Sequence, residues 1–249
     1  AEYAGLAAGE THGIDDVETI VGAPTPSIYS PEASLFVLQA GAALIEQKRA
    51  DFLYLSLTDY MQHTYAPDAG ESLAFHESLD HEIGRLLEAG AVLGITADHG
   101  MNAKVNADGS PRVIYLETLL QEHLDDNGVR VICPITDPYV VHHGALGSAV
   151  TVYLPEAACT DEVAAWIMSL DGVTEVYDRT HAAEILELPA DRIGDLYVLS
   201  DRDVVLGRSP GYHDLSALQC SLRSHGGRFE ETVPMLLSEP LADSHQSCV

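Results

Sequence analysis

Basic side chains are scarce in this chain of 249 residues, where 12 lysines and arginines stand against 39 aspartates and glutamates. The formal net charge of −27 gives a surface that repels nucleic acid and anionic membranes, so we expect neither as a partner. An anionic substrate could approach only a site with strong local positive charge. Bound divalent metal ions supply such charge, which makes a metal-dependent site a natural hypothesis for an anion-binding protein of this composition.

Cysteine is also scarce, and the spacing of the four cysteines contains no C-x-x-C pair; they are Cys133, Cys159, Cys220 and Cys248. This pattern indicates neither a thiolate zinc knuckle nor a disulfide framework, and it fits a reducing, cytoplasmic compartment. No apolar run reaches transmembrane length, and no signal peptide is visible. Hydrophobic residues make up 46 % of the chain, enough for one large domain or for a domain with a substantial insertion.

The most informative stretch is an apolar run, residues 91–95, that leads into Asp98, His99 and Gly100. It predicts a buried strand that runs out into a loop, where both side chains can converge on one point. An Asp oxygen and a neutral His nitrogen suit zinc or a similar divalent ion, and glycine lets the backbone pass close to a bound group. The alternative is an Asp that caps the next turn beside a solvent-facing His.

A second apolar run, residues 52–57, predicts another buried strand, and Asp59 and His63 follow its end. If the chain turns into a helix there, side chains four residues apart share one face and can hold one ion. A solvated helix face is the alternative for this common spacing. A helix predicted over residues 68–89 connects the two strands as a right-handed βαβ unit. Because ligands bind beyond the carboxyl ends of parallel strands, both Asp/His pairs are expected at one edge of a sheet.

Beyond residue 104 the character of the chain changes to short strands and short helices. Near the end, His225 precedes two glycines and a predicted strand over residues 232–237, which fits a ligand on a flexible loop beside the sheet. The predicted organisation is therefore part of an α/β metal-binding core over residues 1–104, an inserted α+β cap over 105–222, and a return to the core with a C-terminal tail over 223–249. Within the cap, the pattern predicts strands at 150–154 and 173–177, a helix at 160–170, and a strand pair formed by 195–200 and 203–206.

The remaining histidine motifs are expected not to bind metal. His76 and His81 lie within the predicted 68–89 helix and are interpreted as surface or packing residues. His142 and His143 are adjacent in an extended run, where neighbouring side chains point to opposite faces, so a shared ion is disfavoured. His213, which precedes an Asp, is a similarly weak signal.

Taken in order, the candidate ligands resemble the pattern of the alkaline phosphatase superfamily; they are Asp59, His63, Asp98, His99 and His225. Longer runs are similar to the phosphonoacetate hydrolase family: Thr58-Asp59-Tyr60 with His63, ITADHGMNAK at 95–104, ITDPYVVHHGALGS at 135–148 and LRSHGG at 222–227. The resemblance covers about residues 24–237. It implies an α/β fold of the alkaline phosphatase type, with a mostly parallel sheet sandwiched by helices and an inserted α+β cap.

The resemblance implies hydrolysis of the C–P bond of phosphonoacetate, giving acetate and phosphate, with two zinc ions per active site. By motif, Asp59, His63 and His225 would hold one zinc, while Asp98 and His99 would belong to the second. The family's nucleophilic Thr, a further Asp of the second site and the lysines that bind the substrate carboxylate come from a region that matches nothing in residues 1–50. The nucleophile is therefore expected upstream of residue 1, and the chain is expected to be the C-terminal part of the enzyme, inactive on its own.

Two alternatives stay open at this point. One is a phosphodiesterase or nucleotide pyrophosphatase of the same superfamily, which would share the metal ligands but not the longer runs. The other is a non-catalytic metal-binding or scaffold fragment, suggested by the nucleophile that cannot be placed. The expected partner is a small anionic phosphonate substrate, and a homodimer is a further expectation.

Overall fold

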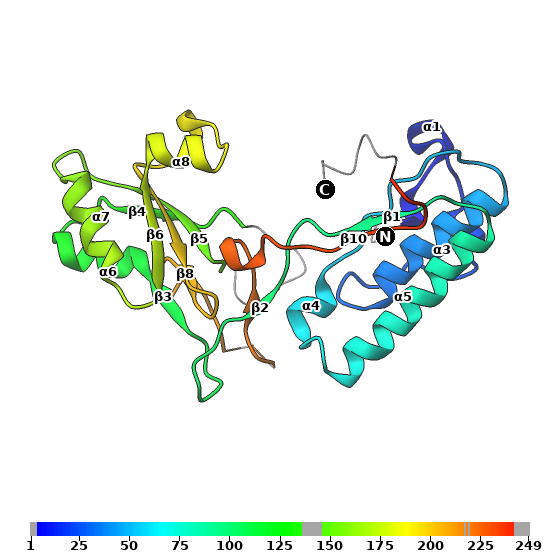
Figure 1. Cartoon of the computed structure of the whole chain (residues 1–249), viewed down its shortest axis with the longest axis horizontal. Coiled ribbons are helices and arrows are strands. Elements are labelled where there is room, and N and C mark those ends of the chain that lie inside the picture. The colour runs from blue at the N-terminus through cyan, green and yellow to red at the C-terminus, as the bar shows by residue number, and fades with distance from the viewer. Residues whose placement is uncertain (1–3, 136–145, 217, 219, 242–249) are drawn as a thin grey trace. The chain divides into compact units, whose positions relative to one another are not determined.

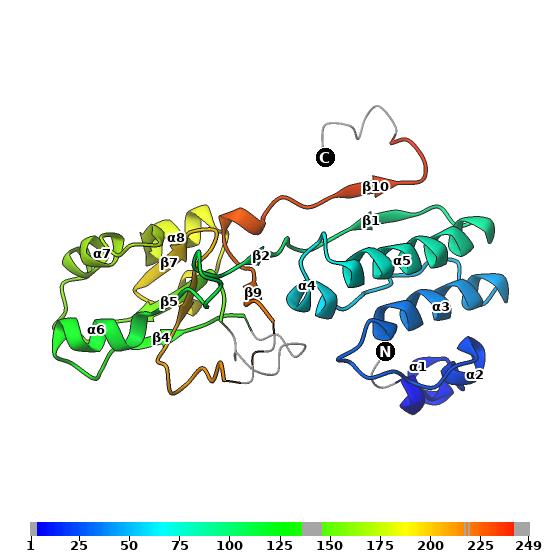
Figure 2. The same ribbon diagram turned by 90° about the horizontal axis from the view of Figure 1, so that it is seen from below.

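The computed structural model describes residues 4–135, 146–216, 218 and 220–241. The chain divides into two compact units, which are drawn in Figures 1 and 2: Ala1–Ala97 with Pro234–Val249 (unit 1) and Asp98–Val233 (unit 2). Within the described ranges, no helix has both the length and the apolar character needed to cross a membrane. The predicted cap, residues 105–222, lies inside unit 2, and its predicted boundaries stay a prediction.

Unit 1 is mainly helical. Its described elements are η1 (Ala4–Leu6), α1 (Gly9–His12), α2 (Val17–Val21), α3 (Glu32–Glu46), α4 (Tyr60–Thr64), α5 (Gly70–Glu88), β1 (Gly94–Thr96) and β10 (Met235–Leu237). Helices α3 and α5 lie side by side (Figure 2) and enclose a small core centred on Leu38, Ala42 and Leu86. Helix α3 begins directly after Pro31. Helix α5 forms close to the predicted helix at 68–89 and ends two residues before Gly90, whose φ of 89° is one that glycine adopts freely.

The two apolar runs of unit 1 do not form the predicted parallel pair. Strand β1 pairs antiparallel with β10, placing Ile95 opposite Leu236, and residues 52–57 form no strand. Their side chains alternate in exposure: Phe52 is 88 % and Tyr54 is 86 % exposed, whereas Leu55 packs on the core between α3 and α5. A strand needs hydrogen-bonded neighbours, and the described residues provide none here. The prediction of a buried strand at 52–57 is therefore wrong for this structure.

Unit 2 is built around a four-stranded antiparallel sheet of order β4-β5-β7-β6. Helices α6 and α7 lie against this sheet (Figure 1) and close a core centred on Leu120, Val150, Ile167 and Val198. The described elements are β2 (Asn102–Ala103), β3 (Val113–Tyr115), α6 (Leu116–Leu124), β4 (Arg130–Ile132), β5 (Ala149–Tyr153), α7 (Thr160–Met168), β6 (Val173–Asp178), α8 (Arg179–Ile185), η2 (Ala190–Arg192), β7 (Leu196–Ser200), β8 (Val205–Gly207), β9 (Arg223–Ser224) and η3 (Arg228–Glu230).

The strands expected near 150–154, 173–177 and 195–200 form, as does the helix near 160–170, but one pairing differs. β8 pairs in parallel with β3 and not with β7, which lies between β5 and β6. The backbone N–H groups of Val205 and Leu206 donate to the carbonyls of Arg112 and Gly147. Because these partners satisfy β8 on both sides, the chain leaves the main sheet after the turn that follows Ser200, and the predicted strand pair is wrong.

Candidate metal centre

In unit 1, one turn of helix brings a carboxylate and an imidazole together. Asp59 immediately precedes α4, and its carbonyl accepts the His63 N–H at 3.0 Å. This i, i+4 bond aligns the two side chains, so that Asp59 Oδ2 lies 3.2 Å from His63 Nε2. Two ligand atoms that each lie 2.0–2.1 Å from a tetrahedral zinc are about 3.3 Å apart. The predicted helical turn is therefore confirmed, and its donor atoms have the separation that a shared ion requires.

In unit 2, two histidines far apart in sequence are in ring contact. The imidazoles of His99 and His225 stack with centroids 3.5 Å apart and planes inclined by 5°. Asp98 lies beside His99, its Oδ1 being 3.7 Å from His99 Nε2, and its side chain is largely exposed. Three of the five predicted ligands therefore gather in this unit, although the resemblance assigns His225 and His99 to different ions.

The tautomer of His99 follows from its surroundings. Its Nδ1 lies 2.9 Å from the carbonyl oxygen of Gly100. A carbonyl oxygen only accepts hydrogen bonds, so this ring nitrogen carries the proton in the neutral imidazole. Nε2 then keeps its lone pair, which is the state that a metal ligand needs, with the N–H of the other nitrogen held by an outer acceptor.

Backbone pairing joins the segments that carry these two histidines. We call residues 98–102 the first imidazole loop and residues 225–227 the second imidazole loop. Strands β2 and β9 pair antiparallel, with Asn102 opposite Ser224. The Gly100 N–H donates to the Glu230 carbonyl at 2.7 Å, and the Ser148 N–H donates to the His225 carbonyl at 2.8 Å. The ring contact thus rests on a short sheet ladder and two flanking backbone bonds.

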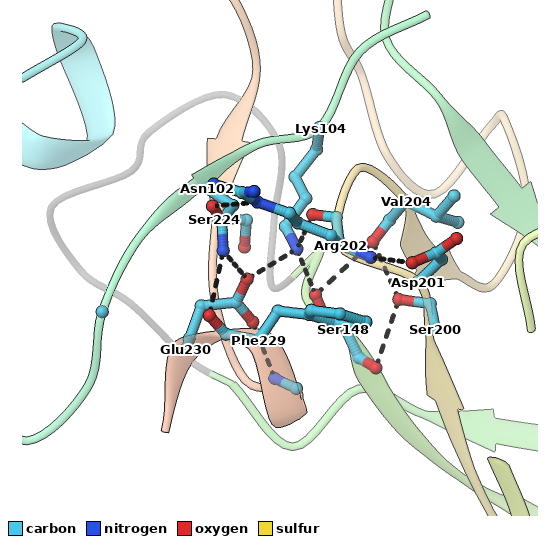
Figure 3. A network of polar contacts seen from close by, with 12 residues as sticks. Asn102, Lys104, Ser148, Ser200, Asp201, Arg202, Val204, Ser224, Phe229 and Glu230 are labelled. Atoms are coloured by element: carbon cyan, nitrogen blue, oxygen red, sulfur yellow. Dashed lines mark hydrogen bonds and ion pairs between the residues drawn. The ribbon is translucent and has the colours of Figure 1, made fainter. Parts of the chain in front are cut away.

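Unit 2 also contains a buried ion pair (Figure 3). Lys104 Nζ is 3.0 Å from Glu230 Oε1, and the two side chains are 0 % and 1 % exposed. Burial lowers the pKa of Lys104, and the neighbouring Glu230 carboxylate opposes that shift. Sequence reasoning missed this pair. Lys104 closes the ITADHGMNAK run, but a lysine is ordinarily an exposed residue, and its position in that run was the only available signal.

The other predicted residues fall as follows. His76 and His81 are both exposed, in agreement with their interpretation as surface or packing residues, and His76 Nδ1 lies 2.6 Å from the carbonyl of Ser72 one helical turn earlier. His213 is buried, and its Nε2 accepts the N–H of Arg208 at 3.0 Å. His142 and His143 lie outside the described residues.

Asp59 and His63 belong to unit 1, and Asp98, His99 and His225 belong to unit 2. Within unit 1 the structure brings Asp59 and His63 together, and within unit 2 it places His99 beside both Asp98 and His225. The expected sharing of one ion by Asp59, His63 and His225 spans the two units and stays a prediction.

Solved structures place this chain in the alkaline phosphatase-like fold class. Murine ectonucleotide pyrophosphatase / phosphodiesterase 5 matches with a TM-score of 0.53 and 21 % identity, over 82 % of this chain and 52 % of that one. A mutant of alkaline phosphatase PafA matches with a TM-score of 0.52 and 16 % identity, over 84 % of this chain and 44 % of that one. At these identities the likeness shows the fold alone, and it confirms the predicted α/β class.

A family match assigns the chain more narrowly than the fold class does. The type I phosphodiesterase / nucleotide pyrophosphatase family matches residues 30–228, so the chain belongs to this family. Phosphonoacetate hydrolase from Sinorhizobium meliloti, solved with phosphonoformate, is 45 % identical with a TM-score of 0.90, over 98 % of this chain and 60 % of that one. Its complex with phosphonoacetate gives the same identity and coverage with a TM-score of 0.89.

The similarity to phosphonoacetate hydrolase that the sequence motifs predict is thereby confirmed. The present chain spans 60 % of the length of that solved chain. The activity of the whole enzyme is therefore only proposed for this chain.

Proposed function

We propose that this chain belongs to a hydrolase that cleaves the C–P bond of phosphonoacetate to acetate and phosphate. The observation that carries the proposal is the 45 % identity, over 98 % of the chain, to a phosphonoacetate hydrolase solved with phosphonoacetate bound. The positions of the candidate ligands support it, because a donor pair and a donor group of the right chemistry lie after the segments that the motifs single out.

Two zinc ions per active site are part of this proposal. Asp59, His63 and His225 would hold one, and Asp98 and His99 would contribute to the other. When bound, such ions clamp phosphoryl oxygens and lower the pKa of a nucleophile. The charges agree with an anionic substrate: two zinc ions bring +4, whereas Asp59, Asp98 and the one further Asp that the resemblance implies bring −3. The site would then be positive within a chain whose net charge is −27.

The chemistry of a phosphonate sets what the protein must supply. The C–P bond has no oxygen leaving group, so the departing carbon carries the bonding electron pair. In phosphonoacetate this pair delocalises into the carboxylate as an enolate, which takes a proton to become acetate. The nucleophile forms a P–O bond as the C–P bond breaks, and water then releases phosphate. We assign the nucleophilic role to a Thr, and carboxylate binding to lysines, outside the 249 residues.

The proposal is tested by measuring phosphate release from phosphonoacetate. Two proteins are compared, residues 1–249 alone and a form extended at its N-terminus by the segment that the resemblance implies. We expect turnover by the extended form only, because residues 1–249 would hold the second ion with two protein ligands, fewer than the three of a usual catalytic zinc. Turnover by residues 1–249 alone would show that the nucleophile lies within them.

A phosphodiesterase or nucleotide pyrophosphatase activity is the second candidate, and the family match over residues 30–228 favours it. The discriminating measurement compares hydrolysis of bis-p-nitrophenyl phosphate with that of phosphonoacetate by the extended form. Faster hydrolysis of the diester would replace the first proposal with the second. Absence of both activities in a zinc-loaded protein would leave the non-catalytic metal-binding role.

A further inference from the structure

Glu230 contacts both imidazole loops of unit 2. Its Oε1 accepts the Asn102 Nδ2–H at 2.6 Å (Figure 3), and its main-chain carbonyl accepts the Gly100 N–H at 2.7 Å. Both donors belong to the first imidazole loop. Its Oε2 accepts the N–H of Gly227, in the second imidazole loop, at 3.0 Å. Glu230 is therefore hydrogen-bonded to both loops, twice to the first and once to the second.

Lys104 fixes this carboxylate in turn. Its Nζ donates to Glu230 Oε1 at 3.0 Å, to Ser148 Oγ at 2.6 Å and to the Arg202 carbonyl at 2.7 Å. These contacts use all three protons of the ammonium group. Ser148 extends the connection, because its own N–H donates to the carbonyl of His225. The network thus reaches the second imidazole loop by two routes, one through Glu230 and one through Ser148.

Such a network is a costly way to gain stability. Removing two charges from water costs free energy that an ion pair recovers only with near-ideal geometry, and apolar side chains of similar volume often serve stability as well or better. Fully bonded buried polar groups instead fix one arrangement of the backbone segments that they connect. Here the connected segments are the two loops whose histidine rings are in contact.

We propose that Glu230, held by Lys104, is a positioning residue that sets the spacing of the two imidazole loops and thereby the parallel contact of His99 with His225. The consequence for zinc binding rests on the proposed function, whereas the positioning itself does not.

The test compares Glu230→Gln with a matched control, Glu117→Gln, in the 249-residue chain. Glu117 is also a buried carboxylate in unit 2, accepting the Val131 N–H at 2.8 Å and an Arg208 N–H at 3.2 Å. Both changes remove one buried negative charge and leave a cation without its partner. The partners of Glu117 lie outside the imidazole loops, so the control reproduces the loss of stability without the loss of positioning.

The first readout is the set of imidazole ring resonances of His99 and His225 in the metal-free protein, assigned by His→Gln replacement of each. Rings stacked at 3.5 Å shift one another's resonances strongly. We expect Glu230→Gln to move both sets of resonances and Glu117→Gln to leave them in place. Wild-type ring resonances in folded Glu230→Gln would overturn the inference, whatever happens to stability.

The second readout is zinc affinity. We expect Glu230→Gln to weaken binding about 10–100-fold, the usual effect of losing an outer-shell partner, and Glu117→Gln to leave it unchanged. If the wild-type chain binds no zinc while Glu230→Gln still moves the ring resonances, the proposed zinc site fails and the positioning role stands.

A double variant separates positioning from stability. Lys104→Met with Glu230→Gln removes both buried charges, so thermal stability should recover relative to Glu230→Gln alone. The ring resonances and the zinc affinity should stay altered, because a Gln side chain cannot accept from both loops as the carboxylate does. If Glu230→Gln fails to fold, the double variant supplies the ring measurement. Recovery of wild-type ring resonances in it would show that the network has only a structural role.

Discussion

The two units carry their candidate ligands on frameworks of different kinds. In unit 1, Asp59 and His63 lie one helical turn apart, so four consecutive peptide units create their 3.2 Å approach. In unit 2, His99 and His225 meet because a two-residue strand pair and a buried ion pair join distant parts of the chain. A locally built pair depends on one turn of helix, whereas a pair built from distant segments depends on the integrity of a whole unit.

The two units also differ in how completely their apolar side chains are buried. Unit 2 buries Val150, Ile167 and Val198 completely beneath two helices. In unit 1, Phe52 and Tyr54 are almost fully exposed, and all three residues of β10 are exposed. Changes at equivalent kinds of residue should therefore have unequal effects in the two units.

The largest difference in stability loss is expected when one ion pair in each unit is broken. Lys104→Met leaves the Glu230 carboxylate buried without its cation, and should lower the free energy of unfolding of unit 2 by about 3–5 kcal/mol. Arg85→Met removes the partly exposed partner of the buried Glu82 in unit 1; because the Gln39 Nε2–H still donates to this carboxylate at 2.9 Å, the change should cost less, about 1–2 kcal/mol. The single tryptophan, Trp166 in α7, reports unfolding of unit 2 by its fluorescence, and amide exchange of α5 reports unit 1. Equal losses for the two variants would remove the distinction between the units.

A similar contrast is expected for apolar side chains. Leu196, 1 % exposed in β7, should lose about 2–5 kcal/mol of stability on replacement by Ala, because a cavity remains in the core. Phe52→Ala should change stability by no more than about 0.5 kcal/mol, since this ring already faces solvent. Urea titration followed by Trp166 fluorescence and by circular dichroism measures both. A large loss from Phe52→Ala would show that the exposed ring is packed in solution.

The smallest expected effect is a pH dependence confined to unit 2. Because the pKa of Lys104 in the folded chain is lowered from 10.5, the unfolded chain binds more protons between the two pKa values. The free energy of unfolding should therefore rise with pH in that interval, by at most about 1.4 kcal/mol per pH unit for one proton. Lys104→Met should lack this rise, and Arg85→Met should keep it. Parallel stability curves for wild type and Lys104→Met would contradict the assignment.

The sequence predicts the local features well and the long-range ones poorly. The i, i+4 spacing of Asp59 and His63 and the helix pattern over residues 68–89 depend on near neighbours, and the structure contains both features. The motif runs also identify the family. By contrast, the buried strand predicted from the apolar run at 52–57 does not form, because hydrophobic residues alone do not provide a hydrogen-bonded neighbour.

The contacts of unit 2 illustrate why long-range features escape sequence reasoning. Nothing in a single sequence pairs Lys104 with Glu230, 126 residues away, and both residue types are ordinarily exposed. The ring contact of His99 with His225 depends on the pairing of β2 with β9, strands of two residues each that leave no periodic signal. The resemblance names these histidines as ligands, but only the structure shows what holds them together.

We propose above that Asp59, His63 and His225 hold a single zinc ion. Calorimetric zinc titration of the 249-residue chain with Asp59→Ala, His63→Ala, His225→Ala and the double variant His63→Ala/His225→Ala tests it most directly. We expect one tight site, which each single change weakens by more than the about 10–100-fold cost of losing an outer-shell partner. Because His63 and His225 would bind the same ion, the double variant should lose no more zinc per chain than either single variant. Separate sites, one lost with His63 and another with His225, would contradict the account.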